Sequence, residues 1–205
     1  MSNSLSEEQI VADYNALRQV RRDNKKSIIK TLSDGTPTFL TSVVYTDPVF
    51  AKKIINYFSP QFKPNDTFID PCKGHGAFID NLPTPNYWCE IQDGRDYLEH
   101  TIHYDWCFAN FPWRGLVYTK LANHALSTCQ NVVSLVKFST AVGTNKRFKD
   151  ATKNNMFMKE IIFADWDDAN FSFTDGTKKL KEGFILAIIH WQKNWLNGTI
   201  WNDWT

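Results

Sequence analysis

The sequence predicts an α/β fold whose sheet is mostly parallel and ends in an antiparallel pair of strands. Short apolar runs typical of buried strands alternate with segments of helical periodicity, as in a parallel sheet covered by helices. The last two apolar runs, 160–164 and 183–191, are joined by a polar loop and predict the antiparallel pair. A chain of 205 residues is long enough for one such domain with little left over.

Three parts follow from the pattern: an N-terminal helical arm (1–35), a central domain (36–193) and a Trp-rich C-terminal tail (194–205). Residues 4–30 carry a capping-box start and an apolar face at helical spacing, and the second half of this segment is basic. These charges form either a solvated helix face or a surface for phosphate or a partner. The tail either packs back on the domain or extends away from it.

The central domain begins with a helix. Asp47 suits its N-cap and Pro48 its first turn, and the helix ends before Pro60. A strand at 67–70 runs into a turn that contains Gly74 and Gly76 and into the start of another helix. The following elements are strands at 87–90 and 106–109, a helix at 116–126, a strand at 131–138 and a short polar helix or loop at 147–157.

Composition excludes several classes of protein. The chain is 42% hydrophobic and 22% charged with a net charge of +1, and no apolar run approaches a membrane span, so we expect no membrane contact. The polar, acidic N-terminus does not resemble a signal peptide, and four widely spaced cysteines favour buried free thiols over disulfides or zinc. We therefore expect a cytoplasmic protein, in the host cytoplasm if it is phage-encoded. The five histidines form no metal-binding pattern.

Polar side chains gather where the predicted strands end. Asp70 precedes the two glycines, Glu90 ends the next strand, and Asp96 follows a turn that lifts it toward the same edge of the sheet. Glycines allow a ligand to approach the backbone closely, and an acid after the second strand suits the hydroxyls of a ribose. The three acids therefore form either a nucleoside pocket or a set of solvent-facing turn caps. The next strand leads into Asn110-Phe111-Pro112-Trp113, whose amide and indole are suited to the edge and face of an amine-bearing ring.

Together these segments resemble motifs I to IV of class I S-adenosylmethionine-dependent methyltransferases, which have a Rossmann-like fold. The segments are 70–78, 89–91, 94–98 and 105–113, and the resemblance covers roughly residues 40–193. It is most specific for adenine-N6 DNA methyltransferases of the compact phage and bacterial type, whose motif IV is Asp/Asn-Pro-Pro-aromatic. It implies S-adenosyl-L-methionine as cofactor, held by residues around the glycine turn and by a motif X equivalent (Thr46, Asp47, Pro48, Asp70, Gly74, Gly76, Phe78, Glu90, Asp96).

The resemblance also implies the catalytic residues. Asn110 and the Phe111 carbonyl would accept the two hydrogens of the target amine, Pro112 would fix the backbone, and Trp113 would stack on the target base. Phe111 departs from the usual motif, where this position is proline. Ribosomal-RNA adenine dimethylases have a similar Asn-aliphatic-Pro-aromatic motif, so the departure is compatible with catalysis.

Four functions follow from this pattern. The first is methylation of adenine N6 in DNA, and the alternatives are the same reaction on RNA, methylation of a protein glutamine amide, and a non-catalytic subunit that partners an active enzyme. No segment is long enough for an inserted recognition domain, so we also expect a homodimer or a partner subunit. Nucleic-acid contacts are expected at basic or polar segments (18–30, 146–153, 165–181).

Overall fold

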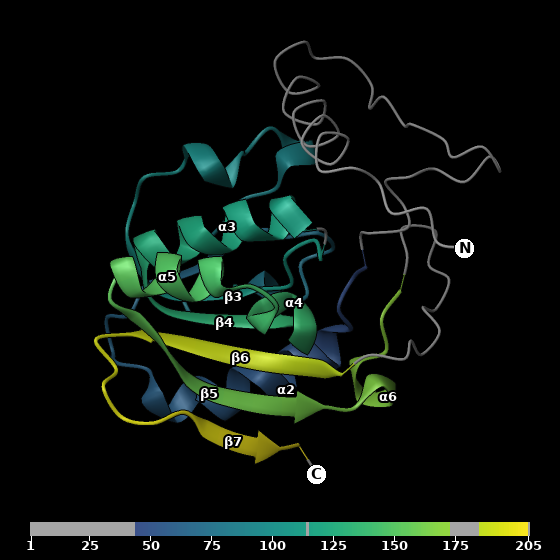
Figure 1. Cartoon of the computed structure of the whole chain (residues 1–205). Coiled ribbons are helices and arrows are strands. Elements are labelled where there is room, and N and C mark those ends of the chain that lie inside the picture. Colours follow the sequence, from purple (N-terminus) through teal and green to yellow (C-terminus); the bar gives the residue numbers. More distant parts are fainter. Residues whose placement is uncertain (1–43, 114, 173–184, 205) are drawn as a thin grey trace, which may run out of the picture.

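The computed structural model of the chain describes residues 44–113, 115–172 and 185–204, so the predicted N-terminal arm lies outside the described residues. The α/β prediction is confirmed. Within the described residues the sheet contains seven strands: β1 (Phe68–Asp70), β2 (Asn86–Trp88), β3 (Tyr104–Ala109), β4 (Cys129–Lys137), β5 (Met156–Ala164), β6 (Leu186–Lys193) and β7 (Ile200–Asp203). Their order is β2-β1-β3-β4-β6-β5-β7 (Figure 1). Among these seven described strands, only β6 runs antiparallel to its neighbours, β4 and β5, as the sequence predicted for the last strand pair.

One face of the sheet is covered by α2 (Pro48–Phe58), which lies behind the strands in Figure 1. The helix begins where predicted, because Asp47 Oδ1 accepts hydrogen bonds from the backbone N–H groups of Val49 and Phe50. Its buried side consists of Phe50, Ala51, Ile54, Ile55 and Phe58. These residues pack in one cluster with Phe108, Val133 and Leu135 of the sheet.

The opposite face is covered by α3 (Gly115–Thr128), α4 (Phe138–Val142) and α5 (Asn145–Lys153), which cross the front of the sheet in Figure 1. Side chains of β4 alternate between the two faces: Val132 and Val136 pack with α3, whereas Val133 and Leu135 pack with α2. The central strands are therefore buried on both sides, which explains why they read as continuous apolar runs.

The C-terminal tail adds β7 to the sheet beside β5, in parallel register. A buried carboxylate holds it there, since Glu160 of β5 accepts hydrogen bonds from the Tyr57 hydroxyl of α2 and from the Asn202 side-chain amide of β7. Trp204 then packs against Phe50 and Tyr57. Within the described ranges the tail therefore packs back on the body.

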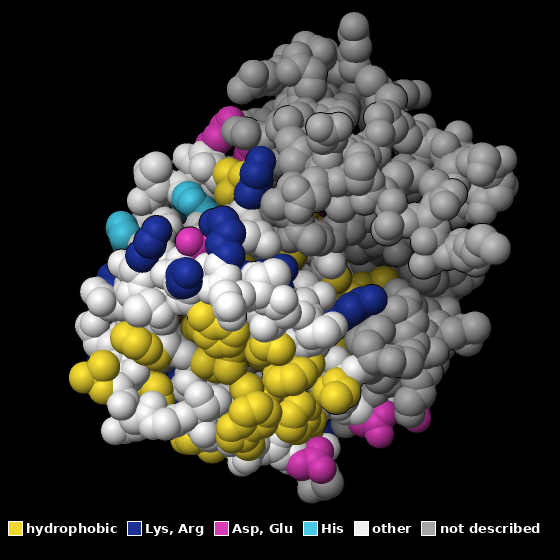
Figure 2. All heavy atoms as spheres, viewed as in Figure 1, with side chains coloured by type: hydrophobic (Ala, Val, Ile, Leu, Met, Phe, Trp, Pro, Cys, Tyr) yellow, Lys and Arg dark blue, Asp and Glu magenta, His cyan; other side chains and the backbone are white. Residues whose placement is uncertain are grey.

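An apolar area lies over β5, β6 and β7, on the side that faces the viewer in Figure 2. Aromatic rings of α4, β5 and β7 also pack together: Phe138 meets Phe163 and Trp201 edge-to-face, at interplanar angles of 68° and 63°. Trp201 remains 57% exposed. Lys and Arg side chains lie above this area, over α3 and α5 (Figure 2). No helix in the described part of the chain has the length and apolarity to cross a membrane.

A helix start is predicted after the glycine turn that follows β1. The chain forms a helix there, but only a short 3-10 helix, η2 (Ile79–Asn81). The reason is local, because Leu82 precedes Pro83 and adopts an extended conformation (φ −77°, ψ 143°) that ends the helix. Two further 3-10 helices, η3 (Ile91–Asp93) and η4 (Tyr97–Glu99), lie between β2 and β3.

Candidate functional site

Asn110 follows the last residue of β3 and has a fixed side chain. Its Nδ2 donates hydrogen bonds to the Val44 carbonyl at 2.9 Å and to Thr46 Oγ1 at 3.1 Å. Its Oδ1 is buried and has no hydrogen-bond partner among the described residues. A buried amide oxygen without a partner costs free energy, so it is suited to a donor that a ligand brings.

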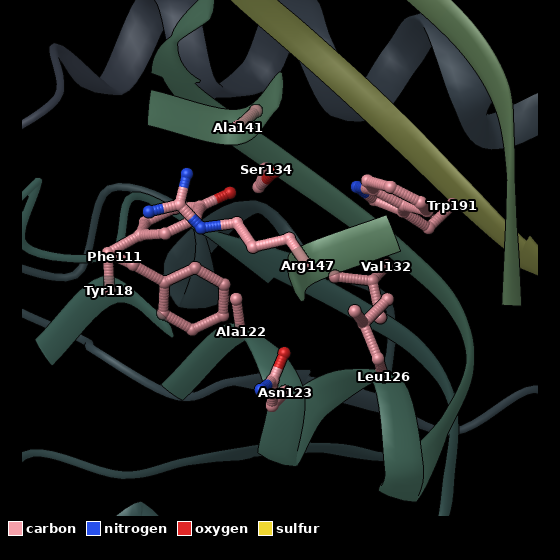
Figure 3. A pocket seen from close by; sticks show the side chains of 10 residues that line it. All are labelled: Phe111, Tyr118, Ala122, Asn123, Leu126, Val132, Ser134, Ala141, Arg147 and Trp191. Carbon is pink, nitrogen blue, oxygen red and sulfur yellow. The ribbon is translucent and has the colours of Figure 1, made fainter. Parts of the chain in front are cut away.

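Phe111 is buried in the hydrophobic core between the sheet and α3. Its ring is only 1% exposed and meets the ring of Tyr118 on α3 edge-to-face, at 5.9 Å between centroids. Figure 3 shows this ring with Tyr118 and Arg147 around a small hollow, whose volume of about 10 Å³ admits a single water. The Phe111 side chain therefore anchors the motif in the core between the sheet and α3. Proline, which is smaller, could not fill this space.

Trp113 packs against both hydrophobic clusters of the domain, the one on the α3 side of the sheet and the one on the α2 side. Its indole Nε1 donates to the Leu135 carbonyl at 3.3 Å, and its ring meets Phe171 edge-to-face at 5.2 Å. Lys137 lies over the ring at 5.8 Å. Trp113 and Pro112 are both half-buried, so the indole is held at the site and still partly accessible.

The glycine turn begins at Asp70, the last residue of β1. Asp70 is 1% exposed; its Oδ1 accepts from the Cys72 N–H, and its Oδ2 is without a partner in the part of the chain that the structure describes. Burial, with smaller contributions from Glu90 and Asp80, raises the pKa of Asp70 to about 7. Gly74 and Gly76 have positive φ angles of 52° and 91°, which favour glycine, and Phe78 is buried behind them.

Glu90 follows β2 and ties the turn to the next strand. One carboxylate oxygen accepts from the Gly74 N–H at 3.0 Å and the other from the Gln92 N–H at 3.3 Å. Asp96 is buried and caps η4, accepting from the Leu98 N–H at 3.0 Å. Both acids thus act as turn caps in this structure, and Glu90 also contacts the backbone of the glycine turn.

The segment before α2 bridges the two halves of the site. Thr46 bonds Asn110, while the Tyr45 ring stacks on His75 at 3.7 Å and lies against Gly74. A Cβ on Gly74 would lie 2.9 Å from that ring, so the close approach requires glycine there. Asp47 serves as the helix cap and also accepts from the Asn170 side chain at 2.9 Å, and Pro48 is exposed.

The structure brings together contacts that sequence reasoning missed. The Val44 carbonyl, Tyr45 and Phe171 all contact predicted site residues, and Tyr45 pairs with Ser172 in an isolated β-bridge. Tyr45 directly precedes the predicted motif X equivalent (Thr46, Asp47, Pro48), and this position is the one sequence signal that pointed to it. Phe171 lies in a loop with no periodicity, so nothing local identified it.

The basic stretch at 146–153 is only partly a free surface. Arg147 is half-buried, lies over the Tyr118 ring at 5.0 Å and donates to Thr119 Oγ1, so it faces inward (Figure 3). Lys146 pairs with Asp150 at 2.7 Å, whereas Lys149 and Lys153 are exposed. Within the described ranges, no group of three or more His, Cys, Asp or Glu side chains is placed to hold a metal ion. All four cysteines are free thiols, and three of them are buried.

Comparison with known proteins gives a likeness of fold. No protein-family model and no curated protein matches the chain. A protein from Pyrococcus horikoshii, proposed to be an RNA methyltransferase, superposes with a TM-score of 0.58 at 14% identity, covering 87% of this chain and 98% of that one.

A second solved structure is the modification subunit of a proposed type I restriction enzyme from Vibrio vulnificus. It superposes with a TM-score of 0.51 at 10% identity, covering 99% of this chain and 53% of the subunit, so this chain spans about half the subunit's length. The chain has the α/β fold of class I methyltransferases, with its sheet and antiparallel strand pair as predicted.

Proposed function

We propose that this protein is an S-adenosylmethionine-dependent methyltransferase that methylates the N6 amine of adenine in DNA. The observation that carries the proposal is the Asn110 amide: its nitrogen is held by protein atoms, and its buried oxygen has no partner among the described residues. It stands at the carboxyl end of β3, beside the glycine turn that follows β1. Ligands of open α/β sheets bind outside the carboxyl ends of the strands, where strand order reverses, and β1 occupies that position here.

The residues at this edge fit the proposed donor. S-adenosylmethionine carries an ammonium and a sulfonium charge, and the turn presents the carboxylates of Asp70 and Glu90. Asp70 Oδ2 lacks a partner among the residues described, and its pKa of about 7 would fall beside a cation, which favours the charged carboxylate. We assign the donor site to the turn and its neighbours (Asp47, Pro48, Asp70, Gly74, Gly76, Phe78, Glu90, Asp96), whereas the Thr46 hydroxyl contacts Asn110.

The chemistry follows from the same groups. Bound S-adenosylmethionine would supply an electrophilic methyl group. The adenine amine is a poor nucleophile because its lone pair is delocalised into the ring. Asn110 Oδ1 and the Phe111 carbonyl would accept its two hydrogens, favour a pyramidal nitrogen and stabilise the positive charge that develops on it. Holding donor and amine in line supplies much of the rate, so no metal or strong base is required of these residues.

Trp113 completes the site as the surface for the target base. Its ring is held by the Leu135 carbonyl and by Phe171, so it is ordered before the base arrives. Extruding a base from a duplex costs roughly a few kcal/mol, which stacking on an indole partly offsets. A rigid, half-buried indole suits that role better than a mobile one.

DNA is preferred over RNA because the motif most resembles that of DNA adenine methyltransferases. Of the two similar structures, one is a proposed RNA methyltransferase and the other a modification subunit of a proposed type I restriction enzyme, so their likeness of fold does not choose between the polymers. Exposed Lys149 and Lys153 on α5 give the described surface some basic character for a polyanion. A second copy or a partner subunit would contribute to recognition of the target sequence.

The test is methyl transfer by the purified protein to duplex DNA and to structured RNA, with N6-methyladenine measured by mass spectrometry. We expect product on DNA, and we expect Asn110→Ala to lower the rate by about 100-fold or more while donor binding persists. Asn56→Ala, an exposed substitution on α2, is the matched control and should behave as wild type.

Each other outcome has a defined meaning. Product on RNA alone would move the substrate to RNA, and methylated glutamine would identify a protein substrate. Donor binding with no product on any polymer would favour the non-catalytic subunit. Absence of donor binding in calorimetry would refute the methyltransferase proposal itself.

A further inference from the structure

Thr46 contacts Asn110 rather than an open pocket. Its side chain is 7% exposed, and its Oγ1 accepts a hydrogen bond from Asn110 Nδ2 at 3.1 Å, across 64 residues of sequence. The resemblance to methyltransferases implied a contact between this residue and the donor. The structure instead places its hydroxyl on the amide that would meet the target amine.

The Val44 carbonyl determines which way that amide points. A backbone carbonyl can only accept, so the atom of Asn110 that lies 2.9 Å from it must be the nitrogen. The flipped amide would set two oxygens against each other and would leave the nitrogen without an acceptor at the buried position. With both hydrogens of Nδ2 engaged, by Val44 and Thr46, the oxygen is left as the only atom of the amide that can serve a ligand.

The geometry points to Thr46 as a positioning residue that, together with the Val44 carbonyl, holds the Asn110 amide with its oxygen toward the target amine. The inference rests on the proposed function for its catalytic consequence, and the hydrogen bonds that carry it are independent of any substrate. Thr46 fixes the rotation of the amide, because a single bond to Val44 would still allow the plane to swing about that contact. Misplacing a reacting group by about 1 Å costs on the order of 100-fold in rate.

Neighbouring contacts hold the segment in place. Tyr45 exchanges two backbone hydrogen bonds with Ser172, at 2.8 and 3.2 Å, and Asp47 caps α2 immediately after Thr46. The residues on either side of Thr46 are thus tied to two separate elements. The hydroxyl can therefore act as a rigid reference for Asn110, and its removal need not displace the segment.

Thr46→Val tests the inference, because valine keeps the shape and removes the hydroxyl. We expect kcat for methyl transfer to fall at least about tenfold while the Kd for S-adenosylmethionine, from calorimetry, changes less than about twofold. Thr46→Ser, which keeps the hydroxyl, should restore kcat to within about threefold of wild type. Thr152→Val is the matched control: Thr152 is exposed on α5, and its hydroxyl donates to the Phe148 carbonyl, far along the chain from the site.

A second readout needs no activity. In an NMR spectrum of the uniformly ¹⁵N-labelled protein, the Asn110 side-chain amide, assigned by its loss in Asn110→Ala, should exchange slowly with solvent because both hydrogens are bonded. Thr46→Val should shift this signal and speed its exchange, and Thr46→Ser should not. An unchanged Asn110 signal in Thr46→Val would overturn the positioning role.

The two readouts separate the possible failures. A shifted signal with no methyl transfer by wild type would leave the positioning role and remove the proposed function. A loss of donor affinity that matches the loss of kcat in Thr46→Val would assign Thr46 to the donor instead. A serine variant as slow as the valine variant would show that the hydroxyl is not the determining group.

Discussion

Phe111 offers the sharpest test of how the site is supported. The methyltransferase motif that residues 110–113 resemble usually has proline at this position, and Phe111→Pro would match it. The structure predicts the opposite effect on stability. The Phe111 ring is 1% exposed and packs edge-to-face on Tyr118, and proline would leave most of that space unfilled.

The magnitude follows from core truncations. Removing a buried phenylalanine ring costs about 3–5 kcal/mol of unfolding free energy. A domain of this size is stable by only about 5–15 kcal/mol, so Phe111→Pro and Phe111→Ala should both lose a large part of it. Phe111→Leu keeps most of the apolar volume and should cost less than about 1.5 kcal/mol. The leucine variant also keeps the backbone carbonyl, so it should retain methyl transfer.

Urea unfolding followed by circular dichroism gives these free energies, with equal m-values as the check that two states are compared. Phe148→Ala is the control, because that ring is 39% exposed on α5 and its loss should cost about 1 kcal/mol or less. If Phe111→Pro unfolded within about 1 kcal/mol of wild type, the reasoning that Phe111 anchors the motif through packing would be refuted.

Three further predictions concern titratable groups. Because burial raises the pKa of Asp70 from 3.8 to about 7, its stabilising contribution is full below pH 3.8 and is lost as pH rises through 7. Asp70→Asn should therefore remove a slope of about 1.4 kcal/mol per pH unit from the stability profile in that window, and an unchanged slope would contradict the burial argument. His190 is fully buried between Phe58 and Trp106, and burial lowers its pKa from 6.5 to about 3. The free energy of unfolding should therefore fall as pH drops from 6.5 toward 3. His190→Phe should make this fall less steep, as measured by urea unfolding at each pH. An equally steep fall in the variant would show that other groups cause the pH dependence. Glu90→Ala removes the acceptor of the Gly74 N–H, so the Kd for S-adenosylmethionine, measured by calorimetry, should rise about tenfold or more. Glu90→Gln should have an intermediate Kd. An unchanged Kd in Glu90→Ala would exclude Glu90 from the donor site.

Local chemistry was enough to predict much of the fold. Asp47 and Pro48 determined the start of α2, and the apolar runs located the central strands, because caps and buried strands depend on nearby residues. The glycine turn predicts a helix start, and η2 begins there; Pro83 explains why this helix is short. The carboxyl ends of parallel strands meet at one edge, so the sequence predicts that Asp70 and Asn110 lie near each other, in keeping with the parallel pairing of β1 and β3.

The orientation of the site's side chains was decided only by the tertiary structure. The sequence alone identified Asn110, Phe111 and Trp113 as a unit but could not show that the amide is held by Thr46 and Val44. Those partners lie 64 and 66 residues away, and no local pattern encodes a hydrogen bond across that separation. The sequence likewise could not show that the Phe111 side chain points into the core toward α3. The direction of a side chain after a strand depends on the residues that pack around it. Residue type and order thus determined which groups are present, while long-range packing determined which way each one faces.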